Sequence, residues 1–298
     1  MSRPVRAVLI GAKGQVALSL ARTLPAAGFE VTTLARPAHD LTRLDALTAA
    51  IIAARPAVVI NPAAYTAVDR AEDEPDAAYA INRDAAGAIA AAAAKAEAAV
   101  IQFSTDYVFA GTQSTAYVET DVTGPIGVYG ASKLAGEVAV AAANPRHVIL
   151  RTAWVCSADG ANFLKTMMRL AAERPEVKVV NDQVGSPTFA ADLAAATVRI
   201  AQAAVGAAAV AAQFGTFHLV SQGSTTWCGF ARAIMAASKA RGGQGVPVHA
   251  ITTAEFPTKA RRPAYSKLDT GKIKRVYGIE LPHWQAALET CLDDIIVK

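Results

Sequence analysis

The chain has 298 residues, 53% of them hydrophobic, and 29 lysines and arginines against 25 acidic residues give a formal net charge of +4. This length suits one large domain or two smaller ones, and the hydrophobic content excludes a mainly disordered chain. The basic excess is small and spread out, which argues against a dedicated nucleic-acid partner. Three widely separated cysteines predict buried free thiols rather than a disulfide framework or a zinc site.

The sequence predicts neither a signal peptide nor a membrane span. The first apolar run, residues 7–10, is too short for a signal peptide. The longest uncharged stretch, residues 200–220, is mostly alanine and lacks the leucine and phenylalanine density of a membrane helix. We therefore expect a cytoplasmic protein with no membrane partner.

Short apolar runs alternate with alanine-rich helical stretches along the first half of the chain. They predict strands at 5–10, 29–34, 57–61, 100–104 and 147–151, a sixth strand at 177–180, and helices at 15–24, 44–54, 75–98 and from about 129 to 143. This alternation is typical of a doubly wound parallel sheet, the Rossmann-type α/β fold. We predict a dinucleotide-binding domain at 1–155 and a smaller, mostly substrate-binding region at 156–298. Within the second region, some segments at about 177–193 are expected to return to the first domain.

The turn after the first strand has the composition of a nucleotide-binding turn. Gly11 and Gly14, with Lys13 between them, stand where a strand is followed directly by a helix. Glycine lets the backbone approach a pyrophosphate, and the helix start offers free N–H groups. An ordinary tight turn is the alternative, but the strand and helix on either side favour dinucleotide binding.

The end of the second strand predicts which dinucleotide binds. NAD sites usually place a carboxylate there, whereas this strand ends at Leu34, followed by Arg36. Arg36, helped by Lys13, suits the 2′-phosphate of NADPH; a solvent-facing arginine and the use of NADH stay open. Asp40 and Leu41 are placed near the adenine, and the small residues at 61–66 allow close approach to the nicotinamide ribose.

A tyrosine and a lysine carry the candidate chemistry. Tyr129 and Lys133 are four residues apart at the start of a helix, so both side chains share one face, and Thr105 ends the fourth strand. Carbonyl reduction needs a hydride and a proton. A neighbouring ammonium and an oxidised nicotinamide are expected to lower the pKa of Tyr129 toward neutrality, and Thr105 can hold the substrate oxygen beside it.

Longer motifs extend this pattern along almost the whole chain, among them STDYVF at 104–109, YGASKLAGE at 129–137 and NDQVGSPT at 181–188. Together they resemble the extended short-chain dehydrogenases/reductases and, within these, the dTDP-4-dehydrorhamnose reductases. The resemblance implies NADPH-dependent reduction of the 4-keto group of dTDP-4-dehydro-L-rhamnose, the last step of dTDP-rhamnose synthesis. It makes Tyr129 the proton donor, Lys133 its partner and ribose anchor, and Thr105 the third catalytic group. It implies cofactor contacts from Gly14, Gln15, Val16, Asp40, Leu41, Ala64, Tyr65, Thr66 and Phe103, and sugar-nucleotide contacts from Thr105, Asp106 and Trp154.

Some expectations stay open beside this resemblance. Arg261 and Arg262 suit the substrate diphosphate, with a solvated basic loop as the alternative. Sugar-nucleotide dehydratases place a glutamate where this chain has Tyr107, but an epimerase, another sugar-nucleotide reductase or a regulatory subunit without turnover stays open. Asn82 is expected to brace the catalytic strand or to lie at the surface.

Some relatives are dimers that hold magnesium between interface carboxylates. Ala191 stands where one of these carboxylates is expected, so we predict no strong metal requirement and leave a homodimer open.

Overall fold

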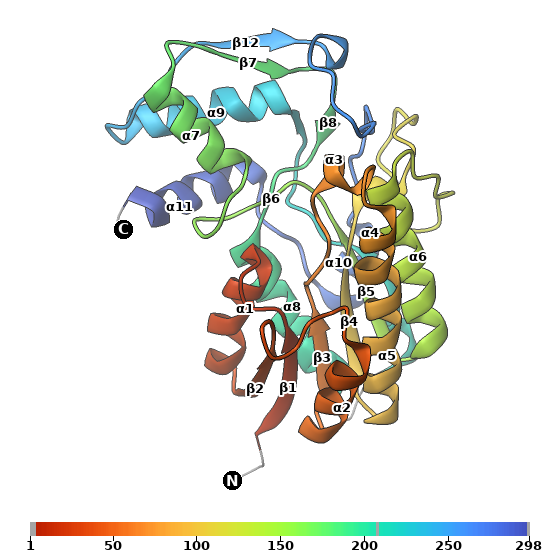
Figure 1. Ribbon diagram of the computed structural model, residues 1–298. Coiled ribbons are helices and arrows are strands. Elements are labelled where there is room, and N and C mark those ends of the chain that lie inside the picture. The colour runs from red at the N-terminus through yellow and green to blue at the C-terminus, as the bar shows by residue number, and fades with distance from the viewer. Residues whose placement is uncertain (1–3, 207–208, 297–298) are drawn as a thin grey trace.

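The computed structural model describes residues 4–206 and 209–296; residues 1–3, 207–208 and 297–298, which include the outer ends of both predicted domains, lie outside the described residues. A six-stranded sheet forms the centre of the larger unit (Figure 1), in the order β2-β1-β3-β4-β5-β10. Every neighbouring pair is parallel, which confirms the predicted doubly wound fold. The strands are β1 (Val5–Ile10), β2 (Phe29–Leu34), β3 (Val58–Asn61), β4 (Ala99–Thr105), β5 (His147–Thr152) and β10 (Gly215–His218).

Helices cover both faces of this sheet, because successive residues of a buried strand point to opposite sides. Leu9 and Ile60 pack with α1 and α8 on one face. Val8 and Val59 pack with α2, α5 and α6 on the other. The helices are α1 (Gln15–Ala26), α2 (Leu44–Ala54), α5 (Ala86–Lys95), α6 (Val128–Ala143) and α8 (Ala190–Val205).

The helix predicted at 75–98 has an irregular middle. After the short α3 (Val68–Ala71), the chain forms α4 (Pro75–Tyr79), a π-helical turn (Ala80–Ala85) and α5 without a break. The π-helical turn holds Asn82 in the interior, at 2% exposure. Gly136 of α6 packs against it so closely that a Cβ would lie 2.0 Å from the Asn82 carbonyl oxygen. The surface alternative for Asn82 is therefore wrong.

A smaller unit lies beyond the carboxyl ends of the sheet strands, at the upper left of Figure 1. Its core is apolar and includes Leu164, Val177, Phe230 and Leu288. Four short strands run between the two units: β6 (Val155–Cys156), β8 (Val184–Gly185), β9 (Thr188–Phe189) and β11 (Thr225–Thr226). The unit itself contains α7 (Phe163–Glu173), β7 (Val177–Val180), α9 (Trp227–Ala240), β12 (Val248–Ile251) and α11 (Trp284–Ile296).

The strand pairing corrects one expectation from the sequence. Residues 177–180 do form a strand, but β7 pairs with β12 in the smaller unit, and the sixth strand of the main sheet is β10. After residue 155, β10 joins the main sheet, and α8 and α10 (Gly271–Tyr277) pack onto it; of the segment expected to return, about 177–193, only the residues from Ala190 on belong to α8. The helix α1 also runs past its expected stop, with Pro25 inside its last turn.

Two other expectations concern cysteines and membranes. All three cysteines, Cys156, Cys228 and Cys291, are buried free thiols, as predicted. Within residues 4–206 and 209–296, each helix is too short or too polar to span a bilayer.

Candidate active site

The turn between β1 and α1 combines tight backbone geometry with open space. Gly11 has a φ of +93°, which residues with a side chain rarely adopt, and its N–H donates to the Leu34 carbonyl at 2.8 Å. Gly14 precedes α1, and no side chain caps the start of this helix. A Cβ added at Gly14 would meet no other atom within 4 Å. The start of α1 thus offers uncapped N–H groups beside open space, the arrangement that binds phosphate.

One cavity of about 290 Å³ joins this turn to the start of α6. It is bounded by the beginning of α1, the carboxyl ends of β4 and β5, the loop after β3, and α6. Most residues predicted for the cofactor and two of those predicted for catalysis, Tyr129 and Lys133, therefore line the same space, whereas Thr105 lies just outside the lining. The predicted residues among its lining are Lys13, Gly14, Gln15, Val16, Ala64, Thr66, Phe103, Tyr129 and Lys133.

The residues predicted for the adenosine end are outside this lining. Arg36 is exposed just after β2. The Asp40 carboxylate accepts hydrogen bonds from the N–H and hydroxyl of Thr42, both at 2.9 Å, which hold the pKa of Asp40 below its ordinary value. Leu41 packs against the apolar cluster beneath α2. Gln15 does line the cavity, but its side chain also donates to the Val155 carbonyl at 3.2 Å and so ties the turn to β6.

Asn82 fixes the loop that follows β3. Its side-chain oxygen accepts the N–H of Tyr65 at 2.9 Å, and its amide donates to the Tyr65 carbonyl and to the Ser132 hydroxyl. The Tyr65 hydroxyl donates to Glu74 at 2.8 Å, so this ring is turned toward α4. Asn82 thus links the loop after β3 to α6, rather than bracing a strand.

Tyr129 and Lys133 both face the cavity from the first turns of α6. Lys133 is 4% exposed, and its Nζ donates to the Phe103 carbonyl at 2.6 Å. Burial lowers the pKa of Lys133 to about 8, against the attraction of Glu137. Burial raises the pKa of Tyr129 to about 12, against a hydrogen bond with Thr105. Desolvation dominates this direction, whereas the expected lowering concerns Tyr129 beside an oxidised nicotinamide as well as the ammonium.

The turn after β4 places Thr105 and Asp106 beside Tyr129. The Thr105 hydroxyl donates to Asp106 Oδ1 at 3.0 Å and accepts the Tyr107 N–H at 3.2 Å. Burial raises the pKa of Asp106 to about 6, and the hydroxyls of Ser266 and Thr105 offset only part of this rise. The Tyr107 ring meets Tyr129 edge-on, with centroids 5.6 Å apart.

Gly130 explains how the turn after β4 and the start of α6 come so close. A Cβ at residue 130 would lie 2.1 Å from the Tyr107 carbonyl oxygen and 3.0 Å from Pro125. No ordinary side chain fits there, so the glycine that follows Tyr129 is a packing requirement of the site.

Two aromatic rings form a stack at the boundary between the units. Trp154 lies parallel to Trp227, with centroids 3.5 Å apart and an interplanar angle of 9°. Trp154 has a positive φ of 46°, and Gly185 lies under its indole, where a Cβ would be 2.5 Å from the ring. Trp227 is thus the ring that holds Trp154.

The two arginines predicted for the diphosphate have different surroundings. Arg262 donates from Nη2 to Asp69 at 2.8 Å and from Nη1 to the Thr258 hydroxyl. Arg261 is exposed. Lys259 in the same loop forms an ion pair with Asp73. Acidic partners in α3 and in the turn after it therefore bind this loop to the larger unit.

Several lining residues were not among the predicted ones. Ser104 and Thr152 sit at or next to the ends of β4 and β5, a position that the strand pattern makes predictable. The Thr152 hydroxyl is buried and has no hydrogen-bond partner among the described residues. Gly160 and Ala161 come from a loop of the smaller unit, for which the sequence carries no signal. The unpredicted lining residues are Ser104, Thr152, Val155, Gly160 and Ala161; Pro62 also lines the cavity and belongs to the segment 61–66 expected near the nicotinamide ribose.

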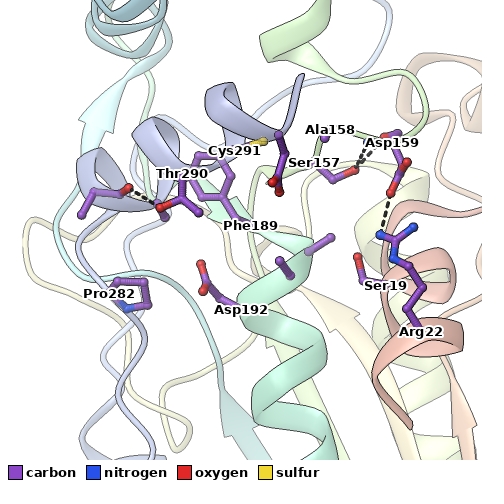
Figure 2. Close-up of a pocket in the computed structure, with 15 residues that line it drawn as sticks. Ser19, Arg22, Ser157, Ala158, Asp159, Phe189, Asp192, Pro282, Thr290 and Cys291 are labelled. Atoms are coloured by element: carbon purple, nitrogen blue, oxygen red, sulfur yellow. Dashed lines mark hydrogen bonds and ion pairs between the residues drawn. The ribbon is translucent and has the colours of Figure 1, made fainter. Parts of the chain in front are cut away.

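A second hollow, of about 160 Å³, lies between α1, α8 and α11 (Figure 2). Arg22 pairs with Asp159 on one side of it at 2.6 Å, and Asp192 faces it from α8. Ala191, which stands where a magnesium-binding carboxylate is expected, also lines it, as does Asp294. None of the predicted catalytic, cofactor or substrate residues does. Within the described part of the chain, no group of three or more histidines, cysteines and carboxylates is arranged to hold a metal ion.

Comparisons with known proteins agree with this geometry. A family model described as the RmlD substrate binding domain matches residues 5–297. The dTDP-4-dehydrorhamnose reductase of Sinorhizobium fredii is 46% identical and covers 94% of each chain, and that of Escherichia coli K12 is 39% identical and covers 97% of each. Among solved structures, dTDP-4-dehydrorhamnose reductase from Bacillus anthracis in complex with NADP aligns with a TM-score of 0.91 at 34% identity, over 98% of this chain and 100% of that chain.

Proposed function

The chain belongs to the dTDP-4-dehydrorhamnose reductase family, and on that premise we infer that it reduces the 4-keto group of dTDP-4-dehydro-L-rhamnose to give dTDP-L-rhamnose. It is an NAD(P)H-dependent oxidoreductase of dTDP-rhamnose synthesis. The full-length match to curated reductases carries this conclusion. The cavity that joins the glycine turn to Tyr129 and Lys133 supports it independently.

The residues around the glycine turn fit a dinucleotide. The uncapped start of α1 at Gly14 suits its pyrophosphate, and the exposed Arg36 and Lys13 suit the 2′-phosphate of NADPH. The relative from Bacillus anthracis was solved with NADP, which supports NADPH as the cofactor here. Asp40 and Leu41 are assigned to the adenine side. When bound, NADPH supplies the hydride for the reduction.

Tyr129 is assigned the proton transfer. As C4 of the sugar gains a hydride, its oxygen takes the proton of the Tyr129 hydroxyl, and the ketone becomes an alcohol. The tyrosinate that remains is costly, because burial already raises the pKa of Tyr129 to about 12. The ammonium of Lys133, one helical turn away on the same face, offsets that cost and also anchors the ribose. Thr105 holds the ketone oxygen beside Tyr129.

The sugar nucleotide is assigned to the boundary between the units. Trp154, held by Trp227, forms one wall, and Asp106 lies next to Thr105 at the reacting end. The exposed guanidinium of Arg261 and the anchored guanidinium of Arg262 are assigned to the diphosphate, since planar guanidinium groups match its oxygens. The same proposal places the cofactor on the larger unit and the sugar nucleotide between the two units.

An NADPH oxidation assay with enzymatically prepared dTDP-4-dehydro-L-rhamnose tests this function. We expect turnover with a product that co-elutes with dTDP-L-rhamnose. Tyr129→Phe should still bind NADPH by fluorescence titration but turn over at least about a hundredfold more slowly. NADPH binding without turnover of the wild-type protein would contradict the substrate, and near-normal turnover of Tyr129→Phe would remove that residue from its role.

A further inference from the structure

We propose that Arg151, Glu137 and Ser104 form a buried positioning network that holds Lys133 in place and keeps it charged. The inference rests on the proposed function, because it concerns how the assigned lysine is maintained. None of these three residues touches the reacting atoms in the assignment above; they act through Lys133.

The network joins α6, β4 and β5 next to the Lys133 side chain. Glu137 lies one turn after Lys133 on α6, and both are at most 5% exposed. Arg151 on β5 donates to the two carboxylate oxygens of Glu137, from Nε at 2.9 Å and from Nη2 at 2.7 Å. Ser104 on β4 donates to the same carboxylate at 2.5 Å. Ser104 and Arg151 face each other across the β4–β5 pairing, so one carboxylate bonds two strands to the helix.

The same register holds Lys133. Its Nζ donates to the carbonyl of Phe103, the residue before Ser104. Two successive residues of β4 therefore bind two successive turns of α6, first at Lys133 and then at Glu137. Arg151 is held in turn by the face of the Phe109 ring, 5.0 Å away. Because Glu137 and Lys133 share α6, any shift of Glu137 relative to β4 would move Lys133 by a similar amount.

Charge gives the network a second effect. Burial lowers the pKa of Lys133 to about 8, and Glu137 is the charge that opposes this fall. The other titratable groups around the site are Tyr129, Asp106, Tyr107, Arg151 and His218. Burial and then the charge of Arg151 lower the pKa of His218 to about 3, so it is neutral at neutral pH and adds no charge. Without the Glu137 carboxylate, the pKa of Lys133 falls further and less of the lysine is charged at neutral pH.

A purely structural ion pair would have different consequences. A buried pair can often be replaced by uncharged residues of similar volume with little loss of stability, whereas removal of one partner leaves a buried unpaired charge. The informative variant is therefore the double replacement Glu137→Gln with Arg151→Met. It removes both charges together and leaves an amide oxygen to accept the Ser104 hydroxyl.

The test compares this double variant with the wild type in thermal unfolding, NADPH affinity and the pH profile of kcat. We expect the double variant to fold and to bind NADPH at least about tenfold more weakly than the wild type at pH 8. The midpoint of the alkaline fall in its kcat should lie about one pH unit below that of the wild type. The sign follows from Lys133: activity falls as the pH rises through its pKa, and that pKa is lower in the variant. A folded double variant with wild-type affinity and pH profile would overturn the proposal.

Further variants keep the proposal testable and separate from the proposed function. Glu173→Gln breaks the exposed ion pair with Arg169 and should change neither the NADPH affinity nor the pH profile of kcat. If the double variant fails to fold, Ser104→Ala decides: it removes one hydrogen bond to the Glu137 carboxylate but keeps both charges, so NADPH affinity should fall through loss of positioning, and wild-type affinity would overturn the proposal. Tyr129→Phe tests the proposed chemistry alone. An inactive Tyr129→Phe together with an unaltered double variant refutes only the network, whereas an active Tyr129→Phe refutes the catalytic assignment.

Discussion

Asp106→Asn is expected to stabilise the protein at alkaline pH and to lose this advantage as the pH falls. The carboxyl is 2% exposed, and burial raises its pKa from 3.8 to about 6. A folded-state pKa above the unfolded value means that ionisation opposes folding. The penalty is therefore absent well below the unfolded pKa, grows between the two values, and is complete above the folded one.

The size of the gain follows from the pKa difference. One pKa unit corresponds to about 1.4 kcal/mol, so the charged carboxylate costs about 3 kcal/mol of unfolding free energy at pH 8. About half of that cost remains near pH 5, where the folded protein keeps the proton but the unfolded chain loses it. Asparagine keeps the shape and the acceptor oxygen for Thr105 without the charge, so the variant should gain this amount.

Urea unfolding of the wild type and the variant at several pH values from about 5 to 8 measures the gain. Other titrating groups are common to both proteins, so the difference between them isolates residue 106. Asp45→Asn, at an exposed carboxylate in the first turn of α2, is the matched control and should show no comparable gain. A variant of Asp106 that is less stable than the wild type at every pH, or a gain independent of pH, would refute the reasoning.

Four further outcomes are expected. Gly130→Ala should lower the unfolding free energy in urea by at least about 2 kcal/mol, because its Cβ would lie 2.1 Å from the Tyr107 carbonyl oxygen; unchanged stability would contradict the packing argument. Gly14→Ala should unfold at the wild-type temperature, since its Cβ meets no atom within 4 Å, yet bind NADPH at least about tenfold more weakly in a fluorescence titration. Arg36→Ala should raise KM for NADPH at least about tenfold and leave KM for NADH within about twofold, whereas equal effects on both would remove the 2′-phosphate role. Dialysis against a chelator should leave kcat unchanged, and a loss that magnesium restores would show a metal requirement.

The main sheet was predictable wherever a strand is long and apolar on both faces. The strand β1 has the predicted bounds because its apolar run ends at Gly11, whereas β2 is half polar and has the predicted bounds because Gly28 precedes it and Pro37 follows it closely. The strand β10 was missed: it has four residues in an alanine-rich stretch, and its place depends on pairing with β5 rather than on local pattern. Residues 177–180 have the local pattern of a strand, but only the tertiary structure decides which sheet a strand joins.

In the candidate site, too, features that depend on local sequence were predictable and features that depend on tertiary packing were not. Tyr129 and Lys133 follow from helical spacing, and Gly14 follows from its place between a strand and a helix. The partners of Glu137 could not be predicted, because Arg151 is close to it only through the register of β4 and β5 against α6. The raised pKa of Tyr129 could not be predicted for a similar reason, since desolvation depends on packing that no local motif records.

The late position of β10 and α8 in the chain has a consequence for synthesis on the ribosome. When residue 155 has been added, five of the six sheet strands exist, but on the face shared by α1 and α8 only α1 is present, and the edge beside β5 has no neighbour. The nascent chain must therefore keep an apolar sheet face from aggregating while about 60 further residues are made, which takes several seconds at typical elongation rates. A fragment that stops at residue 155 would be left permanently in that condition, and we expect it to require a chaperone or to be recovered as aggregate.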